Sequence, residues 1–474
     1  MSFNSLEYGV FFAIFFFLYW FVTNRNLKWQ NILILVASYI FYGWWDWRFL
    51  LLIFTSSLVD FLVGRGMERT GDDRKRKWLL YVSLAVNLGI LGFFKYFNFF
   101  LDSFKTVFGN LSPVAEWSTL DIILPVGISF YTLQTLSYTF DVYKRKMKGT
   151  DDVISFFAYV SFFPQLVAGP IERATSLLPQ FQKKRVFTYE GAADGMRQVT
   201  WGLFKKMVVA DNCGTYVWEY LPTYWDHSGS TLFVATILGT FQLYCDFSGY
   251  SDIAIGSARI LGFNLMKNFD YPFFARNIAE FWQKWHISLI TWFRDYLIGW
   301  LKGYTKLKLV RNIFIIFLIT GLWHGAAWTY IVWGLMNAML FLPIILGKRV
   351  RYRKPVAHGR ALPTLREFWK MFRTVTIFGS VGVMFLSPTV YDGFAYFKNV
   401  FSLSLFTLPM PPTPRIYAFI ILIVVEWRQR TREHGMDFTG QNIPAWQRWL
   451  AYLLVVLCIL FYGGVNQEFI YFQF

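Results

Sequence analysis

A histidine lies in the middle of a long apolar stretch of this chain. His324 is the second residue of the tetrad WHGA at 323–326, inside the apolar run 312–346. An ionisable side chain in such a run is costly unless it faces protein or a water-filled cavity, so it is a candidate functional residue. Imidazole can take a proton from a hydroxyl at neutral pH, as transfer of an acyl group from a thioester to an alcohol requires. The alternative is a structural histidine that is hydrogen-bonded between two helices.

The neighbours of His324 predict a cavity around its ring. Gly321 and Gly325 are four residues apart, a spacing of small residues that lets another helix backbone approach closely. Trp323 and Trp328 supply rigid apolar walls. We therefore expect an enclosed apolar site that contains one imidazole.

A second histidine lies in an aromatic segment upstream. The segment 280–296 reads EFWQKWHISLITWFRDY. On one continuous helix, four of its residues would share a face suited to the membrane interface: Trp282, Trp285, Leu289 and Trp292. His286 lies beside that face, and it is either a second imidazole near the reacting groups or a structural histidine with satisfied hydrogen bonds.

The run 242–252, QLYCDFSGYSD, is unusually polar for an apolar segment of helix length. It places two carboxylates, two serine hydroxyls and two phenols among apolar neighbours. Buried carboxylates require partners or water, so we expect the segment either to line a polar cavity or to break its helix. Asp246 and Asp252 are the candidates for holding a cationic or hydrogen-bond-donating side chain. The alternative is a helix-breaking loop in which these side chains act as caps.

Composition indicates the elements that must carry these residues. The chain has 474 residues, of which 55% are hydrophobic, 21% aromatic and 16% charged, a balance typical of a polytopic membrane protein. We predict an all-α fold with one membrane domain over 1–474, the chemistry concentrated at 240–335, and roughly ten to twelve crossings. Several apolar segments are shorter than the ~20 residues of a full span, so tilted or broken helices are expected. The segments lie near 9–22, 31–45, 49–63, 78–100, 122–140, 153–168, 198–218, 231–260, 312–346, 373–387, 416–426 and 447–463.

The formal net charge of +17 comes from short blocks of Lys and Arg between the apolar runs. This is the positive-inside pattern, in which basic loops stay in the cytoplasm, and it argues against a nucleic-acid partner. It also predicts that both termini lie outside the cytoplasm. The apolar segment 9–22 has neither a basic leader nor a small-residue cleavage site, so we expect it to be retained. The separated cysteines Cys213, Cys245 and Cys458 give neither a disulfide framework nor metal-ligand spacing, and no metal site is expected.

Four motifs, in order along the chain, resemble the membrane-bound O-acyltransferase family. They are PVGISFY at 125–131, QLYCDFSGYSDIAIG at 242–256, EFWQKWHISLITWFRDY at 280–296 and GLWHGAAWTYIVWG at 321–334. The resemblance is closest to the bacterial polysaccharide branch, that of the alginate and peptidoglycan O-acetyltransferases. It implies a ring of tilted helices around a thinned membrane core, crossed by a tunnel. It also implies that His324 is the catalytic histidine and that His286 is a second histidine near the tunnel.

The last six residues, FIYFQF at 469–474, are similar to the aromatic tail of that family, in which a tyrosine is thought to accept the acyl group and pass it outward. Tyr471 would be that acceptor. A phenol is a good leaving group, so an acyl-tyrosine keeps enough transfer potential to acylate a serine of another protein. Without the resemblance, an aromatic anchor at the membrane interface would explain the tail.

The resemblance therefore implies an O-acetyltransferase of the bacterial inner membrane. Acetyl-CoA would be the cytoplasmic donor, with no permanently bound cofactor. A periplasmic or extracellular SGNH-hydrolase-like acetyltransferase would deliver the group to a cell-surface glycan such as alginate or peptidoglycan. Eight residues are expected to line the tunnel or to bind substrate: Gln242, Tyr244, Asp246, Ser248, Asp252, Trp285, Arg294 and Trp323.

Two other functions stay open from the sequence. D-alanylation of teichoic acid is the alternative within the acyltransferases, although the tail fused to this chain favours acetylation. Transport of a glycan or its precursor is the alternative from another class. An internal repeat is the usual sequence feature of a transporter, and no such repeat is evident in this sequence.

Overall fold

The computed structural model describes residues 1–108, 119–298, 301, 305–347, 352, 354–464 and 467–470. All regular elements among these residues are helices, in agreement with the all-α prediction. The chain packs into two compact units. The first unit contains residues 1–192 and 258–265, and the second contains residues 193–257 and 266–474. The single membrane domain over 1–474 stays a prediction.

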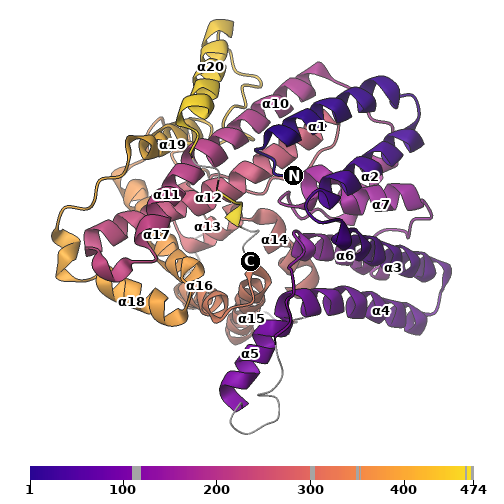
Figure 1. The fold of residues 1–474 in the computed structure, drawn as a ribbon, viewed down its shortest axis with the longest axis horizontal. Helices are drawn as coiled ribbons and strands as arrows, with labels where there is room; N and C mark the ends of the chain where they lie inside the picture. The colour runs from indigo at the N-terminus through magenta and orange to yellow at the C-terminus, as the bar shows by residue number, and fades with distance from the viewer. Residues whose placement is uncertain are drawn as a thin grey trace. The chain divides into compact units, whose positions relative to one another are not determined.

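The first unit is built from the helices of the N-terminal part of the chain (Figure 1). They are α1 (Leu6–Phe17), α2 (Leu27–Gly43), α3 (Leu50–Arg69), α4 (Asp73–Leu91), α5 (Phe97–Phe108), α6 (Ile128–Tyr143), α7 (Val153–Ser161), α8 (Phe163–Leu166) and α9 (Ala174–Phe181). The α3 helix packs against α4, α6 and α7, while α2 packs against α7 and α8.

Polar side chains tie α3, α4 and α6 together inside the first unit. Asp60 of α3 is fully buried and accepts hydrogen bonds from Ser83 Oγ at 2.5 Å and Asn87 Nδ2 at 2.9 Å, both on α4. The Ser83 hydroxyl in turn lies 3.2 Å from the hydroxyl of Thr139 on α6. A buried carboxyl is tolerated only with such partners, so this network fixes how the three helices pack.

The helices of the second unit carry the polar motifs. They are α10 (Tyr189–Leu203), α11 (Asp211–Tyr220), α12 (Gly229–Ile260), α13 (Ile278–Lys284), α14 (Ile287–Phe293), α15 (Lys306–His324), α16 (Trp328–Leu346), α17 (Leu365–Leu386), α18 (Val390–Val400), α19 (Ala418–Arg428) and α20 (Ala445–Tyr462). A π-helical segment at Phe204–Ala210 joins α10 to α11. Helices α15, α16 and α17 pack in succession.

Helices α15 and α16 lie side by side in Figure 1 and approach each other through glycines. A Cβ atom on Gly321 would lie 2.3 Å from the carbonyl oxygen of Tyr330, and one on Gly334 would lie 2.3 Å from that of Phe317. Only a hydrogen atom fits at these distances. The expectation that Gly321 admits a neighbouring backbone is therefore confirmed.

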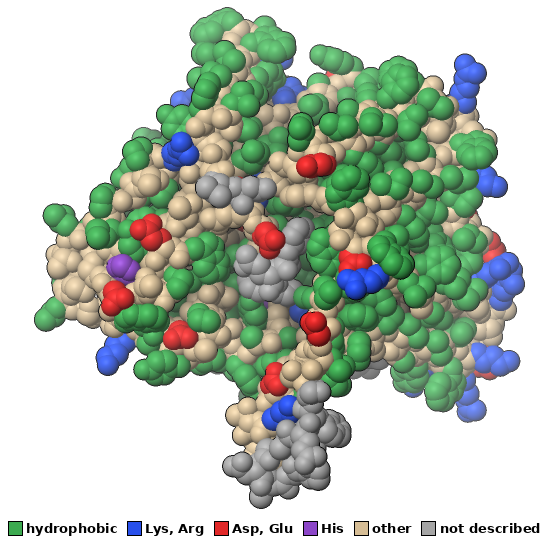
Figure 2. All heavy atoms as spheres, viewed as in Figure 1, with side chains coloured by type: hydrophobic (Ala, Val, Ile, Leu, Met, Phe, Trp, Pro, Cys, Tyr) green, Lys and Arg blue, Asp and Glu red, His purple; other side chains and the backbone are tan. Residues whose placement is uncertain are grey.

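Five helical segments among the described residues are long and apolar enough to cross a membrane: Trp47–Arg69, Asp73–Phe108, Lys306–His324, Trp328–Leu346 and Ala445–Tyr462. Shorter apolar helices cover Leu6–Val22 and Val153–Leu166. The ring of ten to twelve crossings is not confirmed, because several apolar segments fold as helices shorter than a full span. No residue of α20 is buried, and Figure 2 shows hydrophobic side chains covering this helix, as expected of a helix in contact with lipid.

Replacing Gly321 with alanine tests the packing of α15 on α16. Because the new Cβ would collide with a backbone oxygen, we expect the free energy of unfolding to fall by about 1–3 kcal/mol. Gly382→Ala on α17 is the matched control, since nothing lies within 4 Å of a Cβ there. Thermal unfolding in detergent measures both variants. Equal melting temperatures for the two variants would contradict the close approach.

Candidate active site

His324 ends α15 inside an aromatic enclosure. The residue is 4% exposed, and its ring centroid lies 5.1 Å from that of Trp323 and 5.2 Å from those of Trp333 and Phe385. These rings supply the apolar walls expected around the imidazole, while the cavity itself stays a prediction. One expected wall is wrong: Trp328 lies at the exposed first turn of α16 and is 56% exposed, so Trp333 and Phe385 take its place.

His286 lies at a break between α13 and α14, so the expectation of one continuous helix over 280–296 is wrong. Its φ of +43° is left-handed, a conformation that residues other than glycine rarely adopt. Two backbone hydrogen bonds bracket the break: Asp270 N–H donates to the Lys284 carbonyl at 2.9 Å, and Ile287 N–H donates to the Asn268 carbonyl at 2.8 Å. This pairing stabilises a strained conformation of the kind that often marks functional residues.

The four residues expected at the membrane interface are instead buried: Trp282, Trp285, Leu289 and Trp292. The interfacial interpretation is wrong because the break divides the segment into two short helices, so a single exposed stripe does not form. The ring of Trp285 lies 4.8 Å from that of Phe378 on α17. The indoles thus belong to the interior of the second unit.

Trp323 contacts both histidines. Its ring centroid lies 5.8 Å from that of His286 and 5.1 Å from that of His324. The His286 ring also lies 4.7 Å from Phe247 of α12. The structure therefore brings the two candidate catalytic histidines and one predicted tunnel residue into one aromatic cluster.

The polar run 242–252 lies on one uninterrupted helix, α12. The loop interpretation is wrong, because the carboxylates find partners on neighbouring elements and the helix has no need to break. Asp252 pairs with the buried Lys205 at 2.5 Å, and the Tyr244 hydroxyl donates to Glu426 of α19 at 2.8 Å. Tyr244, Ser248 and Asp252 line a polar cavity of about 20 Å³, room for about one water molecule.

Asp246 holds both a cation and the end of the chain. Its Oδ1 lies 2.7 Å from Lys206 Nζ, and its Oδ2 accepts the backbone N–H of Ile470 at 2.8 Å. Lys206 also pairs with Asp211 at 2.8 Å and donates to the Gln467 carbonyl at 2.9 Å. The cationic partner expected for Asp246 is therefore present, and the same ion pairs anchor residues 467–470.

The anchored tail contacts the aromatic cluster. Phe469 is 1% exposed and stacks on Tyr250 with a centroid distance of 4.2 Å. It also lies 6.0 Å from Phe247, the residue that contacts His286. Tyr471, the expected acyl acceptor, lies outside the described residues.

Gln242 and Arg294 are among the predicted site residues that do not line the polar cavity. Gln242 is buried beside the tail, where a Cβ on Gly214 would lie 2.7 Å from its side-chain nitrogen and 2.3 Å from Gln467 Oε1. The Arg294 side chain is 63% exposed and pairs with Asp295 at 2.9 Å. The structure therefore does not bring Arg294 together with the buried site residues.

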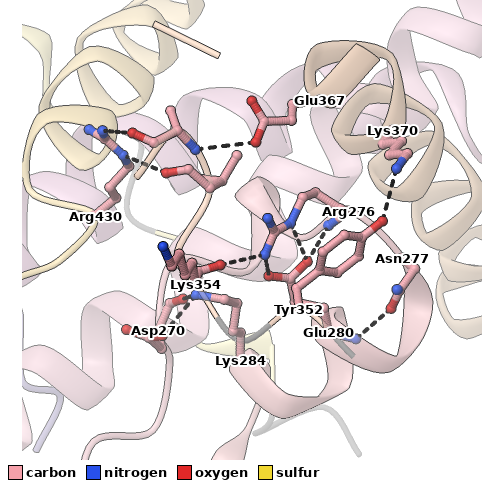
Figure 3. Close-up of polar contacts among 12 residues, drawn as sticks. Asp270, Arg276, Asn277, Glu280, Lys284, Tyr352, Lys354, Glu367, Lys370 and Arg430 are labelled. Carbon is pink, nitrogen blue, oxygen red and sulfur yellow. Dashed lines mark hydrogen bonds and ion pairs between the residues drawn. The ribbon is translucent and has the colours of Figure 1, made fainter. Parts of the chain in front are cut away.

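Ion pairs and a stacked ring hold the start of α13 (Figure 3). Arg276 donates to the carboxylate of Glu280 at 2.7 Å, and its guanidinium carbon lies 3.8 Å from the ring centroid of Tyr352. Lys370 of α17 donates to the Tyr352 hydroxyl at 3.0 Å. Charge-assisted bonds of this kind, partly removed from water, give α13 a fixed position.

Asp270 fixes the backbone segment that brackets His286. It pairs with Lys267 at 2.7 Å and with Lys284 at 2.9 Å. Burial raises the pKa of Asp270, but the two ammonium groups outweigh this effect, so that the pKa lies below its ordinary value. Asp270 is therefore charged at neutral pH and retains both ion pairs.

Sequence reasoning missed several residues that shape the site: Lys205, Lys206, Asn268, Trp333, Phe385 and Glu426. The sequence did contain a signal for two of these residues. Lys205 and Lys206 lie inside the apolar run 198–218, and two lysines there need acidic partners as much as Asp246 and Asp252 need cationic ones. The other residues depend on long-range packing that no local pattern reveals.

Residues 149–351 match the model of MBOAT, the membrane-bound O-acyltransferase family. The probable alginate O-acetylase of Pseudomonas putida is 39% identical over 316 residues, 66% of this chain and 64% of the relative. The peptidoglycan O-acetyltransferase of Helicobacter pylori is 36% identical over 348 residues, with the same coverage of 66% and 64%. The teichoic acid D-alanyltransferase of Bacillus subtilis is 30% identical over 238 residues, 46% of this chain and 58% of the relative.

These matches confirm the resemblance to the membrane-bound O-acyltransferase family that the motifs indicate, and they support an acyltransferase. The matched segment contains both histidines of the aromatic cluster and all eight predicted tunnel residues. The chain spans less than two thirds of the length of these relatives, between 58% and 64%. Tyr471 lies beyond the segment that matches the family model.

Replacing Asp246 with leucine tests the anchor of the tail. The change removes the acceptor of the Ile470 N–H, and a hydrogen bond to a charged group contributes about 1.5–3 kcal/mol. We therefore expect a cysteine at position 470, in a chain whose own cysteines are alanine, to react with a maleimide about ten to a hundred times faster. Asp252→Leu is the matched control, because it removes the carboxylate that pairs with Lys205 and leaves the bonds to the tail in place. Equal labelling in both variants would contradict the anchor.

Proposed function

Because its central segment matches the membrane-bound O-acyltransferase family, we propose that this protein is an O-acetyltransferase that passes an acetyl group across the membrane. The observation that carries the proposal is the anchored tail. Asp246 binds the backbone of Ile470, and Phe469 packs in the aromatic cluster that holds His286. A segment anchored beside this cluster suits a covalent acceptor that follows it directly in the sequence.

The proposed reaction transfers acetyl from a thioester to the phenol of Tyr471. His324 takes the phenolic proton as general base, and the phenolate oxygen attacks the thioester carbonyl carbon. The carbon–sulfur bond then breaks, and the leaving thiolate takes the proton back from His324. The products are acetyl-tyrosine and a free thiol. The apolar walls around His324 favour this chemistry, since they exclude the water that would hydrolyse the intermediate.

The donor is proposed to be cytoplasmic acetyl-CoA, attracted by the basic loops of the chain. No permanently bound cofactor or metal is part of the proposal. Tyr244, Ser248 and Asp252, which line the polar cavity of the second unit, are proposed to line the tunnel or to bind substrate. Trp285 and Trp323 would supply apolar walls nearer to the histidines.

The proposal also includes the transfer of the acetyl group from Tyr471 to its final acceptor. In the inner membrane, with both termini outside the cytoplasm, acetyl-Tyr471 would face the periplasm. An SGNH-hydrolase-like partner would take the acetyl group onto its serine and deliver it to a surface glycan. Relatives named for alginate and for peptidoglycan O-acetylation are 39% and 36% identical to this chain, which supports a glycan of that class.

D-alanylation of teichoic acid is the second candidate, since a relative named for that activity is 30% identical over 238 residues. The higher identity to O-acetylating relatives and the fused aromatic tail favour acetylation. A transporter is not supported by the relatives, which are named as acyl-transferring proteins.

Labelled acetyl transfer tests the two central residues. Membranes that contain the protein should incorporate label from acetyl-CoA, whereas His324→Ala should lose about 10²–10⁴-fold in rate, the usual contribution of a general base. Tyr471→Phe should carry no label. His358→Ala and Tyr462→Phe are matched controls and should behave as the wild-type protein. Undiminished labelling in both central variants would refute the mechanism.

Mass spectrometry of surface polymers tests the acceptor. A strain without this protein should lose O-acetyl groups from one glycan and keep them on all others. Loss of D-alanine from a teichoic acid with unchanged glycan acetylation would instead favour the second candidate.

A further inference from the structure

Asn268 contacts His286 through both its backbone and its side chain. Its carbonyl accepts the N–H of Ile287, the residue after the histidine, at 2.8 Å. Its side-chain Oδ1 lies 3.1 Å from His286 Nδ1. Both residues are 1% exposed, so no bulk water competes for these bonds. One residue therefore contacts both the backbone next to the histidine and a nitrogen of its imidazole.

The remaining bonds of the Asn268 side chain determine which of its atoms faces the histidine. Its Nδ2 donates to Ser251 Oγ of α12 at 3.0 Å. Its Oδ1 accepts the hydroxyl of Ser288 at 2.9 Å, which leaves the second lone pair of that oxygen for the imidazole. An amide oxygen accepts and never donates. Hence Nδ1 of His286 carries the proton, and Nε2 carries the lone pair.

We propose that Asn268 is a positioning residue that fixes His286 in the Nδ1–H tautomer, so that the ring meets the reacting groups only as a proton or hydrogen-bond acceptor. This inference rests on the proposed acyl transfer for its kinetic consequence. The group that faces Nε2 must then be a hydrogen-bond donor, an O–H, N–H or S–H group. A neutral His286 fixed in this way does not donate to the thioester carbonyl.

The electrostatic surroundings agree with a neutral acceptor. Burial lowers the pKa of His286 to about 3. The charged groups on the surrounding elements are engaged with other partners: Asp246 with Lys206, Asp252 with Lys205, Asp270 with Lys267 and Lys284, and Glu426 with Tyr244. Since the imidazole protonates only near pH 3, it stays an acceptor throughout the physiological range.

Nitrogen-15 NMR of histidine-labelled full-length protein in detergent tests the tautomer directly. The chain has five histidines, and the signal of His286 is assigned by its loss in His286→Gln. We expect Nδ1–H in the wild-type protein, a mixture of tautomers in Asn268→Leu, and the wild-type state in Asn312→Leu, which removes another buried asparagine of the second unit. An Nε2–H wild-type ring would overturn the proposal, whatever the reaction.

Acetyl-transfer kinetics test the consequence. Asn268→Leu should lower kcat about tenfold to a hundredfold with an unchanged KM for acetyl-CoA, because part of the population presents the wrong nitrogen. Asn268→Asp keeps the acceptor but adds a charge that raises the pKa of His286 by about 1–3 units. When the pH is lowered, the activity of Asn268→Asp should therefore begin to fall at a higher pH than the activity of the wild-type protein.

The proposed acetyl transfer and the positioning role of Asn268 can be refuted separately. A wild-type protein that transfers no acetyl refutes the proposed function and leaves the tautomer measurement standing. A wild-type protein that transfers acetyl while Asn268→Leu has normal kcat, or while Asn268→Asp keeps the wild-type pH profile, refutes the positioning role. Melting temperatures of the variants show whether each has folded.

Discussion

Two adjacent lysines in the π-helical segment Phe204–Ala210 hold the second unit together at its polar centre. Lys205 pairs with Asp252 and Lys206 pairs with Asp246, both on α12. Removing one member of such a buried pair leaves an uncompensated charge, at a cost of about 3–5 kcal/mol in soluble proteins. The wall of the polar cavity depends on the pair of Lys205 and Asp252, and the anchor of the tail depends on the pair of Lys206 and Asp246.

Glycines make these ion pairs possible. A Cβ on Gly202 would lie 2.6 Å from the Gly249 carbonyl oxygen, and one on Gly249 would lie 2.8 Å from that of Gly202. The end of α10 therefore packs directly on the backbone of α12. A π-helical turn directly after this contact changes the helical periodicity, so that both consecutive lysines reach the same helix. The ion pairs of Lys205 and Lys206 thus depend on the close packing of α10 on α12.

The sequence was informative where the physical requirement is local. A histidine in an apolar run, glycines four residues apart and carboxylates in a helix-length apolar segment each imply a particular environment. The structure surrounds His324 with aromatic rings, brings a backbone against Gly321 and pairs Asp246 with Lys206. The motifs also predicted the family whose model matches the central segment. The failures concern residues whose environment comes from elsewhere in the chain. The break at His286 needs backbone partners at residues 268 and 270, which periodicity cannot reveal. The inward position of Trp333 and the exposure of Trp328 depend on where α16 begins.

The way in which the tail is held has a consequence for its evolution. Two of the bonds to residues 467–470 use main-chain atoms, the carbonyl of Gln467 and the N–H of Ile470. Hydrogen bonds to the backbone fix the path of a segment without prescribing its side chains, as a neighbouring strand does in a sheet, whereas the stacking of Phe469 on Tyr250 does select a ring. Substitutions at position 470 can therefore drift within the limits of burial, with proline as the exception because it has no N–H. The tail is in this respect a bound peptide ligand that happens to be covalently attached to its own receptor.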